Sequence, residues 1–199
     1  MRSTMRPRRT VQQALRMCGL ACALVVIAAP KDTLAQSGPV VAEVLKDWSD
    51  LKKSTLQLAD KMPADKYTYK PPFPVQVKGI SVDTAQEHFG RRVLYIAQVN
   101  VRFLGILGGK AKAPVVDETE AMTSKDASMK AVADSFDYGI ALLKEQTDQT
   151  ILQRINASSI GIASRVRVFG YLDSHTRQID GQLALYLLLS GEVLPAVAR

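Results

Sequence analysis

The sequence predicts an all-α protein, a four-helix bundle, and three observations support this expectation. Apolar residues recur at three- and four-residue steps in four separate segments, which is the spacing of one face of an α-helix. No segment shows a competing strand alternation. Beyond the N-terminal 35 residues the chain contains no cysteine, so the fold must be held by its core alone, and a bundle is the economical arrangement.

Residues 1–35 have the composition of a secretory signal peptide. Five arginines between Arg2 and Arg16 precede an apolar run, MCGLACALVVIAAP (residues 17–30), and small residues follow at Thr33 and Ala35. The apolar run is shorter than the roughly 18 residues that a membrane-spanning helix needs. We therefore expect cleavage after Ala35 and export to the periplasm or the exterior, with a retained anchor as the alternative.

Residues 36–199 would then form one domain of ordinary size. The net charge of the whole chain is +7, but the leader holds six basic groups and one acid, so the remainder carries about +2. This balance gives no support for nucleic-acid binding. Both cysteines, Cys18 and Cys22, lie in the leader, which excludes cysteine catalysis and thiolate metal sites from the mature domain.

The first expected helix spans about residues 40–61. Its apolar stripe includes Trp48, which we expect to be buried, and Pro63 ends it. The stretch ADKYTYKPPFPVQVKGI (residues 64–80) has three prolines in four positions and is expected to be an extended connector, with its tyrosines packed over the end of the bundle.

Capping signals place the other three helices. The second is expected to begin after cap candidates in Ser81–Thr84 and to end near Leu107. The third follows a capping-box pattern at Thr123–Asp126 and ends near Asp148. The fourth begins between Ile160 and Ser164 and runs to about Ser190, where Gly191 suits the position after the helix.

Three motifs in register resemble the DinB-like (DinB/YfiT) family. They are DWSDLKKSTLQLADKMPADKYTYKP (residues 47–71), HFGRRVLYIAQVN (residues 88–100) and HTRQIDGQLALYLLLSGEVLP (residues 175–195). The resemblance implies a four-helix bundle with a metal site made by three histidines, one from the second helix and two from the last. Some members of the family are metal-dependent thiol transferases or isomerases.

This chain departs from the family at the ligand positions. His175 matches the first histidine of the last helix, but Ile179 and Tyr95 stand where the other two are expected. Isoleucine has no lone pair, and tyrosine binds metal well only as the phenolate. His88 lies two turns, about 10 Å, from Tyr95 and cannot replace a ligand at the same level. Helical periodicity places Asp173 and Asp180 off the stripe that carries His175.

We therefore expect no metal and no other cofactor, and a vestigial pocket formed by Tyr95, His175 and Ile179. Two interpretations of His175 stay open: a core histidine that hydrogen-bonds Tyr95 or Gln182, or a base or ligand-binding residue. The function expected is non-catalytic binding of a small molecule or protein in the cell envelope, by a monomer or homodimer that meets the membrane only through its leader. The alternative is a divalent-metal-dependent hydrolase or transferase with a reconfigured site around His175.

Overall fold

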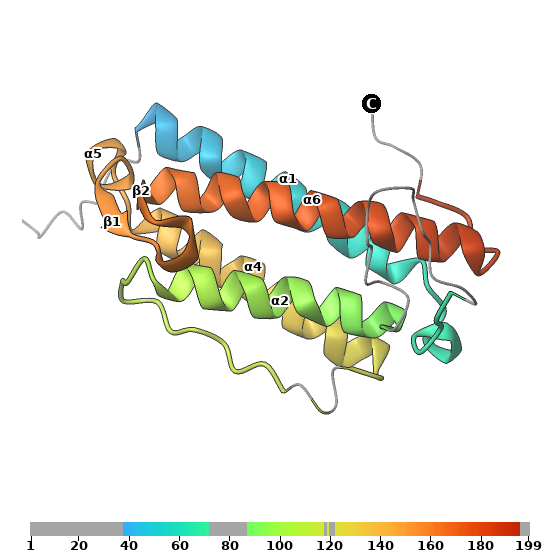
Figure 1. Cartoon of the computed structure of the whole chain (residues 1–199). Coiled ribbons are helices and arrows are strands. Elements are labelled where there is room, and N and C mark those ends of the chain that lie inside the picture. Colours follow the sequence, from blue (N-terminus) through green and yellow to red (C-terminus); the bar gives the residue numbers. More distant parts are fainter. Residues whose placement is uncertain (1–37, 72–86, 118, 120–121, 196–199) are drawn as a thin grey trace, which may run out of the picture. The chain divides into compact units, whose positions relative to one another are not determined.

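Four long helices form the bundle in the computed structural model: α1 (Pro39–Asp60), α2 (Phe89–Gly105), α4 (Lys125–Lys144) and α6 (Arg165–Leu189) (Figure 1). The structure describes residues 38–71, 87–117, 119 and 122–195. Each segment with helical periodicity forms one of these helices, which confirms the all-α four-helix bundle. The predicted signal peptide, residues 1–35, and the cap candidates at Ser81–Thr84 lie outside the described residues.

The helix ends follow local capping chemistry. The imidazole of His88 accepts a hydrogen bond from the Arg91 amide at 3.2 Å, and the hydroxyl of Ser124 accepts one from the Ala127 amide at 3.3 Å. These side chains satisfy amides that have no partner inside the helix. At the end of α6, Gly191 has a φ of +84°, as the position after the helix was expected to require.

The four helices are not arranged in sequence order around the bundle. α1 packs against α4 and α6, and α2 also packs against α4 and α6. α1 and α2 are therefore diagonal partners, although they follow each other in the chain (Figure 1). The connector between them includes the short 3-10 helix η1 (Ala64–Lys66), and the fully buried Tyr67 follows it, as expected for a tyrosine packed over the bundle's end.

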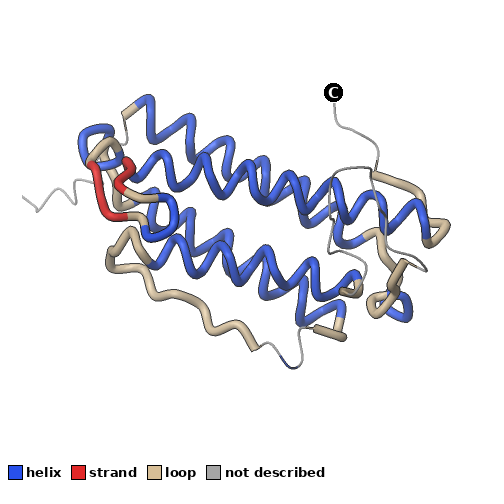
Figure 2. The backbone as a smooth tube through the Cα atoms, in the orientation of Figure 1, coloured by secondary structure: helices blue, strands red, loops and turns tan. Residues whose placement is uncertain are grey.

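A small β-hairpin precedes α6 and corrects the expectation that no strand occurs. Strands β1 (Arg154–Asn156) and β2 (Ile162–Ser164) pair antiparallel with Ile155 opposite Ala163. The turn contains the 3-10 helix η3 (Ser158–Ile160). Figure 2 shows these strands, in red, at one end of the bundle. Strands of three residues are too short to show a readable alternation in the sequence.

The third long helix also stops earlier than expected. It ends at Lys144, and a short helix, α5 (Asp148–Ile151), follows. The Asp148 carboxylate accepts hydrogen bonds from the backbone amides of Val40 and Val41, at 3.2 and 3.0 Å. A residue from the last third of the chain therefore caps α1 at its N-terminus, where a carboxylate also meets the positive end of the helix dipole.

Trp48 occupies the centre of the contact between α1, α4 and α6. Its side chain is 2% exposed, which confirms the burial expected from its place on the stripe. The indole N–H donates to the Phe136 carbonyl oxygen at 3.0 Å, and the ring lies 4.8 Å from the Phe136 ring and 5.3 Å from the Phe169 ring, measured between centroids. The only polar atom of the indole is thus satisfied inside the core.

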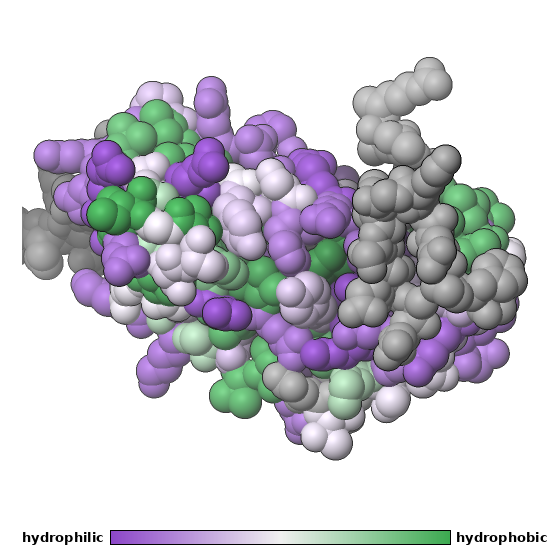
Figure 3. Space-filling view, in the orientation of Figure 1, coloured by the Kyte–Doolittle hydropathy of each residue, from purple (hydrophilic) through white to green (hydrophobic). Residues whose placement is uncertain are grey.

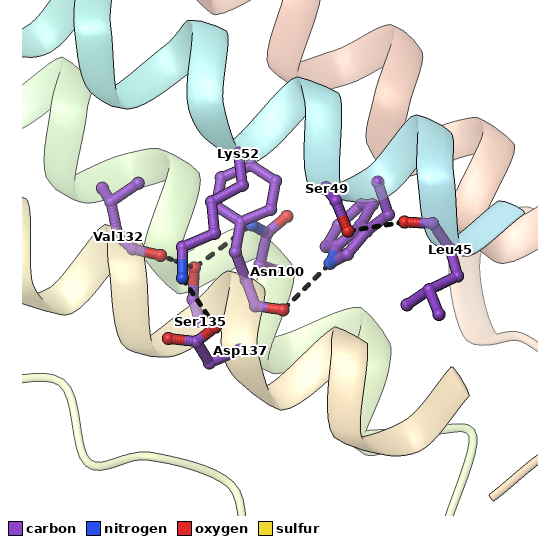
Figure 4. A network of polar contacts seen from close by, with 9 residues as sticks. Leu45, Ser49, Lys52, Asn100, Val132, Ser135 and Asp137 are labelled. Atoms are coloured by element: carbon purple, nitrogen blue, oxygen red, sulfur yellow. Dashed lines mark hydrogen bonds and ion pairs between the residues drawn. The ribbon is translucent and has the colours of Figure 1, made fainter. Parts of the chain in front are cut away.

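Polar contacts cross the α1–α4 and α2–α4 interfaces nearby (Figure 4). The Asn100 amide donates to the Ser135 hydroxyl at 3.2 Å, and that hydroxyl donates to the Val132 carbonyl oxygen at 2.8 Å. At the surface, Lys52 forms an ion pair with Asp137 at 2.6 Å. The buried Asn100–Ser135 contact fixes α2 against α4 because each group would be costly to bury alone.

The surface is mixed in polarity. Figure 3 shows hydrophilic residues over much of one face, with apolar residues in small groups between them. Exposed apolar side chains at the hairpin end include Leu152 and Ile162. Among the described residues, no helix combines the length and apolarity that crossing a bilayer would demand.

Two glycine substitutions should have opposite effects on stability. A Cβ at Gly139 would lie 2.5 Å from Nε1 of Trp48, whereas a Cβ at Gly181 would meet nothing within 4 Å. Alanine is favoured over glycine inside a helix by up to about 1 kcal/mol, so Gly181→Ala should raise the free energy of unfolding. Gly139→Ala should lower it by about 1–3 kcal/mol, because the buried indole cannot move aside. Urea midpoints test this, and a stabilising Gly139→Ala would contradict the packing described here.

Candidate functional site

α2 and α6 run antiparallel, and aromatic residues mark their register. The Tyr186 hydroxyl donates to the Glu87 carbonyl oxygen at 2.7 Å where α2 begins. Further along α2, the ring of Tyr95 lies 5.5 Å from that of His175, measured between centroids. Further still, the rings of Phe103 and Tyr171 are 4.9 Å apart. This register brings Tyr95 and His175 together, as the motif alignment predicted.

The two helices and the hairpin turn enclose a surface groove of about 380 Å³, which we call the Tyr95–His175 groove. Its volume falls within the roughly 300–1,000 Å³ typical of small-molecule sites. The lining combines aromatic rings with hydrogen-bonding groups and contains no carboxylate. The lining residues are Tyr95, Gln98, Val99, Arg102, Phe103, Ser159, Tyr171 and His175.

His175 is half-buried at the edge of this groove and does not point into the bundle core. Its ring lies between those of Tyr95 and Tyr171, with centroid distances of 5.5 and 6.0 Å. Burial lowers the pKa of His175 below its usual value of 6.5, so the imidazole is neutral at pH 7. The side-chain oxygen of Gln182 has no hydrogen-bond partner among the described residues, so it does not accept from His175.

Ile179 does not line the groove. It is 3% exposed and belongs to the hydrophobic core, one helical turn from His175 in the direction of Tyr186. The buried residue beside His175 is Thr176, which is 1% exposed. The interior stripe of α6 therefore runs through Thr176 and Ile179, and His175 lies on its border. This corrects the interpretation of His175 as a core histidine, and the expected pocket of Tyr95, His175 and Ile179 lacks Ile179.

The residues of the groove do not fit the three-histidine metal site implied by the family resemblance. His175 supplies one nitrogen, and its ring neighbours are the phenols of Tyr95 and Tyr171. No group of three or more histidine, cysteine, aspartate or glutamate residues in the described part of the chain is placed to hold a metal ion. A divalent ion at His175 would thus lack the roughly three protein donors that a catalytic site needs.

His88 has a structural role at the start of α2. Besides capping the helix, it has a pKa below its usual value, mainly because burial disfavours the charged ring and also because Lys70 lies nearby. A neutral imidazole can accept the hydrogen bond from the Arg91 amide, whereas a protonated one cannot. His88 thus lies outside the groove and is occupied as a cap.

Asp180 is a half-buried acid that the periodicity argument placed off the stripe that carries His175. Its carboxylate lies at the α1–α6 interface and accepts a hydrogen bond from the hydroxyl of Thr55 at 2.9 Å, while its other oxygen is buried without a hydrogen-bond partner. Burial raises the pKa of Asp180 to about 6, although the hydrogen bond from Thr55 and the charge of Arg177 oppose this shift.

Comparison with known proteins supports the fold. The sequence matches no protein-family model and no curated protein. Among solved structures, it is similar to the crystal structure of a DinB-like protein from Bacillus cereus, with a TM-score of 0.57 and 16% sequence identity. The chain has the DinB-like fold. The likeness covers 79% of this chain and 97% of that one, so the DinB-like bundle accounts for nearly all of the solved protein.

At this level of identity the DinB-like fold is what the likeness establishes, and the chemistry must be read from the chain's own residues. Positions 95 and 175 meet because α2 packs against α6 in this bundle. This packing does not explain the phenol at Tyr95 or the second phenol at Tyr171, which make this groove aromatic. The three motifs did not point to Tyr171 or Arg102. Tyr171 lies about one helical turn from His175 and Arg102 two turns from Tyr95, and this spacing was the signal that could have found them.

Asp180 should make the stability of the bundle depend on pH. Its pKa of about 6 exceeds the roughly 4 of an unfolded aspartate, so the folded state binds the proton more tightly. The cost of burying the charge is fully present above about pH 6 and disappears as the pH falls toward 4. Asp180→Asn should therefore be more stable than the parent by about 1–3 kcal/mol at pH 8 and equal to it near pH 4.

Urea denaturation of both proteins between pH 4 and pH 8 measures this difference. Thr55 can still donate to the asparagine oxygen, so the variant keeps that hydrogen bond. Acid effects common to both proteins cancel in the comparison. A difference that does not change with pH would show that the pKa of the carboxyl is the same in the folded and unfolded states.

Proposed function

We propose that the protein is an exported, non-catalytic binding protein whose Tyr95–His175 groove takes a small planar anion. The observation that carries the proposal is the composition of the groove. Three aromatic rings, from Tyr95, Phe103 and Tyr171, form its walls, and every ionisable lining residue is a potential donor. Flat rings in such a site favour a flat ligand, because aromatic groups stack or meet edge to face.

Charge supports an anion over a cation. Arg102 is exposed beside the groove, with its guanidinium 5.8 Å from the Phe103 ring centroid. The neutral His175 ring can donate one hydrogen bond, and the two phenols and Gln98 add further donors. A carboxylate on an aromatic ring matches this set of donors. A hydrogen bond to a charged acceptor is stronger than one between two neutral groups.

The alternative function is a metal-dependent hydrolase or transferase of the DinB/YfiT type. It would need His175 to act with at least two further metal ligands. The rings beside His175 in the groove are the phenols of Tyr95 and Tyr171, at centroid distances of 5.5 and 6.0 Å. Nothing in the geometry of the described residues favours metal-dependent catalysis over simple binding.

Benzoate provides a direct probe of the groove. Calorimetric titration of the mature protein should show one-to-one binding, weakened about tenfold or more by Arg102→Gln, because a lost charge-assisted hydrogen bond is worth about 1.5–3 kcal/mol. Tyr171→Ala should also weaken binding by removing a wall. Arg167→Gln is the matched control, because Arg167 is an exposed arginine near the start of α6 that does not line the groove.

Three results would overturn the proposal. Undetectable benzoate binding would remove the anion site, and equal loss of affinity in Arg102→Gln and Arg167→Gln would indicate a nonspecific charge effect. Tight one-to-one binding of zinc or nickel by the unmodified protein, abolished by His175→Gln, would favour the metal-dependent alternative.

Export can be tested independently of ligand binding. The leader composition predicts that the exported protein begins at Gln36. Intact-mass measurement of protein recovered from the cell envelope or medium should give the mass of residues 36–199. A mass that includes residues 17–35 would instead identify the apolar run as a retained anchor.

A further inference from the structure

A second cavity lies between α1 and α6 and shares no residue with the Tyr95–His175 groove. We call it the Asp47–Asp173 cavity; its volume is about 260 Å³. It combines an apolar floor with two carboxylates and contains no basic residue. Its lining residues are Val44, Asp47, Trp48, Val166, Phe169, Gly170 and Asp173.

The floor of the cavity is aromatic. Trp48 and Phe169 meet edge to face, at 5.3 Å between centroids and 87° between ring planes, and both are almost fully buried. The indole N–H is already bound to the Phe136 carbonyl oxygen. Only a small part of the two rings reaches the cavity, and that part is apolar, which suits a hydrocarbon body; the ring electrons also attract a nearby cation.

Gly170 lines the cavity without a side chain. It lies within α6, where glycine costs about 1 kcal/mol relative to alanine, and a Cβ at this position would meet nothing within 4 Å. The position therefore has room for a larger side chain. With glycine there, the cavity extends to the backbone of α6.

The carboxylates give the cavity its charge. Asp47 is exposed on α1 and Asp173 is half-buried on α6. Arg177 donates to both oxygens of Asp173, at 3.1 and 3.0 Å, and offsets part of the negative charge from outside the lining. Two acids against one base leave the mouth of the cavity negative. The potential is thus opposite in sign to that expected at the Tyr95–His175 groove.

We propose that the Asp47–Asp173 cavity binds a small organic cation, an ammonium group attached to an apolar body. The ammonium group would lie between the two carboxylates, and the apolar part would cover Trp48 and Phe169. The volume lies just below the roughly 300–1,000 Å³ of typical ligand sites, which selects a small amine. This site is independent of the proposed function, because it uses different residues and the opposite charge.

Trp48 is the only tryptophan in the chain, so its fluorescence reports on this cavity. Titration of the mature protein with benzylamine should give a saturable change in tryptophan emission, and added salt should weaken it because the carboxylates are near the surface. Benzyl alcohol has nearly the same shape without the charge and should bind at least tenfold more weakly. Equal responses to the two probes, or no saturable response to benzylamine, would overturn the proposal.

Variants separate the contributions of charge and space. Asp47→Asn combined with Asp173→Asn should weaken benzylamine binding at least tenfold, and Gly170→Leu should block the cavity. Asp50→Asn is the matched control, since Asp50 is an exposed α1 carboxylate that pairs with Lys46 outside the cavity. If Asp50→Asn weakens binding as much as the double variant, the response comes from general surface charge and the proposal fails.

Two further measurements keep these outcomes interpretable. Circular dichroism should show the parent helix content in each variant, because the changed carboxylates are solvent-accessible and the Gly170 position is open. Tyr171→Ala should leave the benzylamine response unchanged, since Tyr171 lines only the other groove. A loss of the response in Tyr171→Ala would show that the amine binds there and would overturn the assignment to the Asp47–Asp173 cavity.

Discussion

The insertion of Trp48 between three helices determines the arrangement on which both candidate sites depend. Its indole packs against the backbone of α4 at Gly139, donates to the carbonyl of Phe136, and meets the Phe169 ring of α6. A residue larger than glycine at position 139 would force α4 away from α1. Because α6 is held against α1 through the same ring, its orientation about its own axis is set there. That orientation decides which α6 side chains reach the interface with α2.

α6 presents different chemistry at its two interfaces. On the side of α2 lie Tyr171 and His175, which form the aromatic, donor-rich groove. On the side of α1 lie Asp173 and Asp180, the first at a cavity and the second in a buried hydrogen bond with Thr55. The carboxylates and the hydrogen-bond donors of α6 thus lie on different sides of the helix. A single helix can in this way contribute to two sites of opposite charge without the charges neutralising each other.

Sequence periodicity predicted the long helices well and the interior of α6 less well. The stripe containing Trp48 was readable because α1 has one broad buried face with polar residues opposite. α6 carries polar side chains such as Thr176 and Asp180 among the apolar residues at its interfaces, so its apolar stripe is less regular. A rotation of 100° separates His175 from Thr176. Periodicity cannot decide which of two adjacent residues lies at the border of such a stripe, or that Asp180 turns inward. The hairpin and α5 are too short for any periodic signal, whereas the Tyr95–His175 contact was predicted from motif register.

The cap that Asp148 provides for α1 has a consequence for the order in which the chain can fold. Val41 and Asp148 are 107 positions apart, and Trp48 receives its hydrogen-bond partner 88 positions later. α1, the first helix of the described residues, therefore has neither its cap nor its packing partners until most of the protein has been synthesised. Its neighbour in sequence, α2, cannot substitute, because the two are diagonal in the bundle. Contacts between residues so far apart in sequence slow folding, so α1 stays unpacked while the later helices are being synthesised.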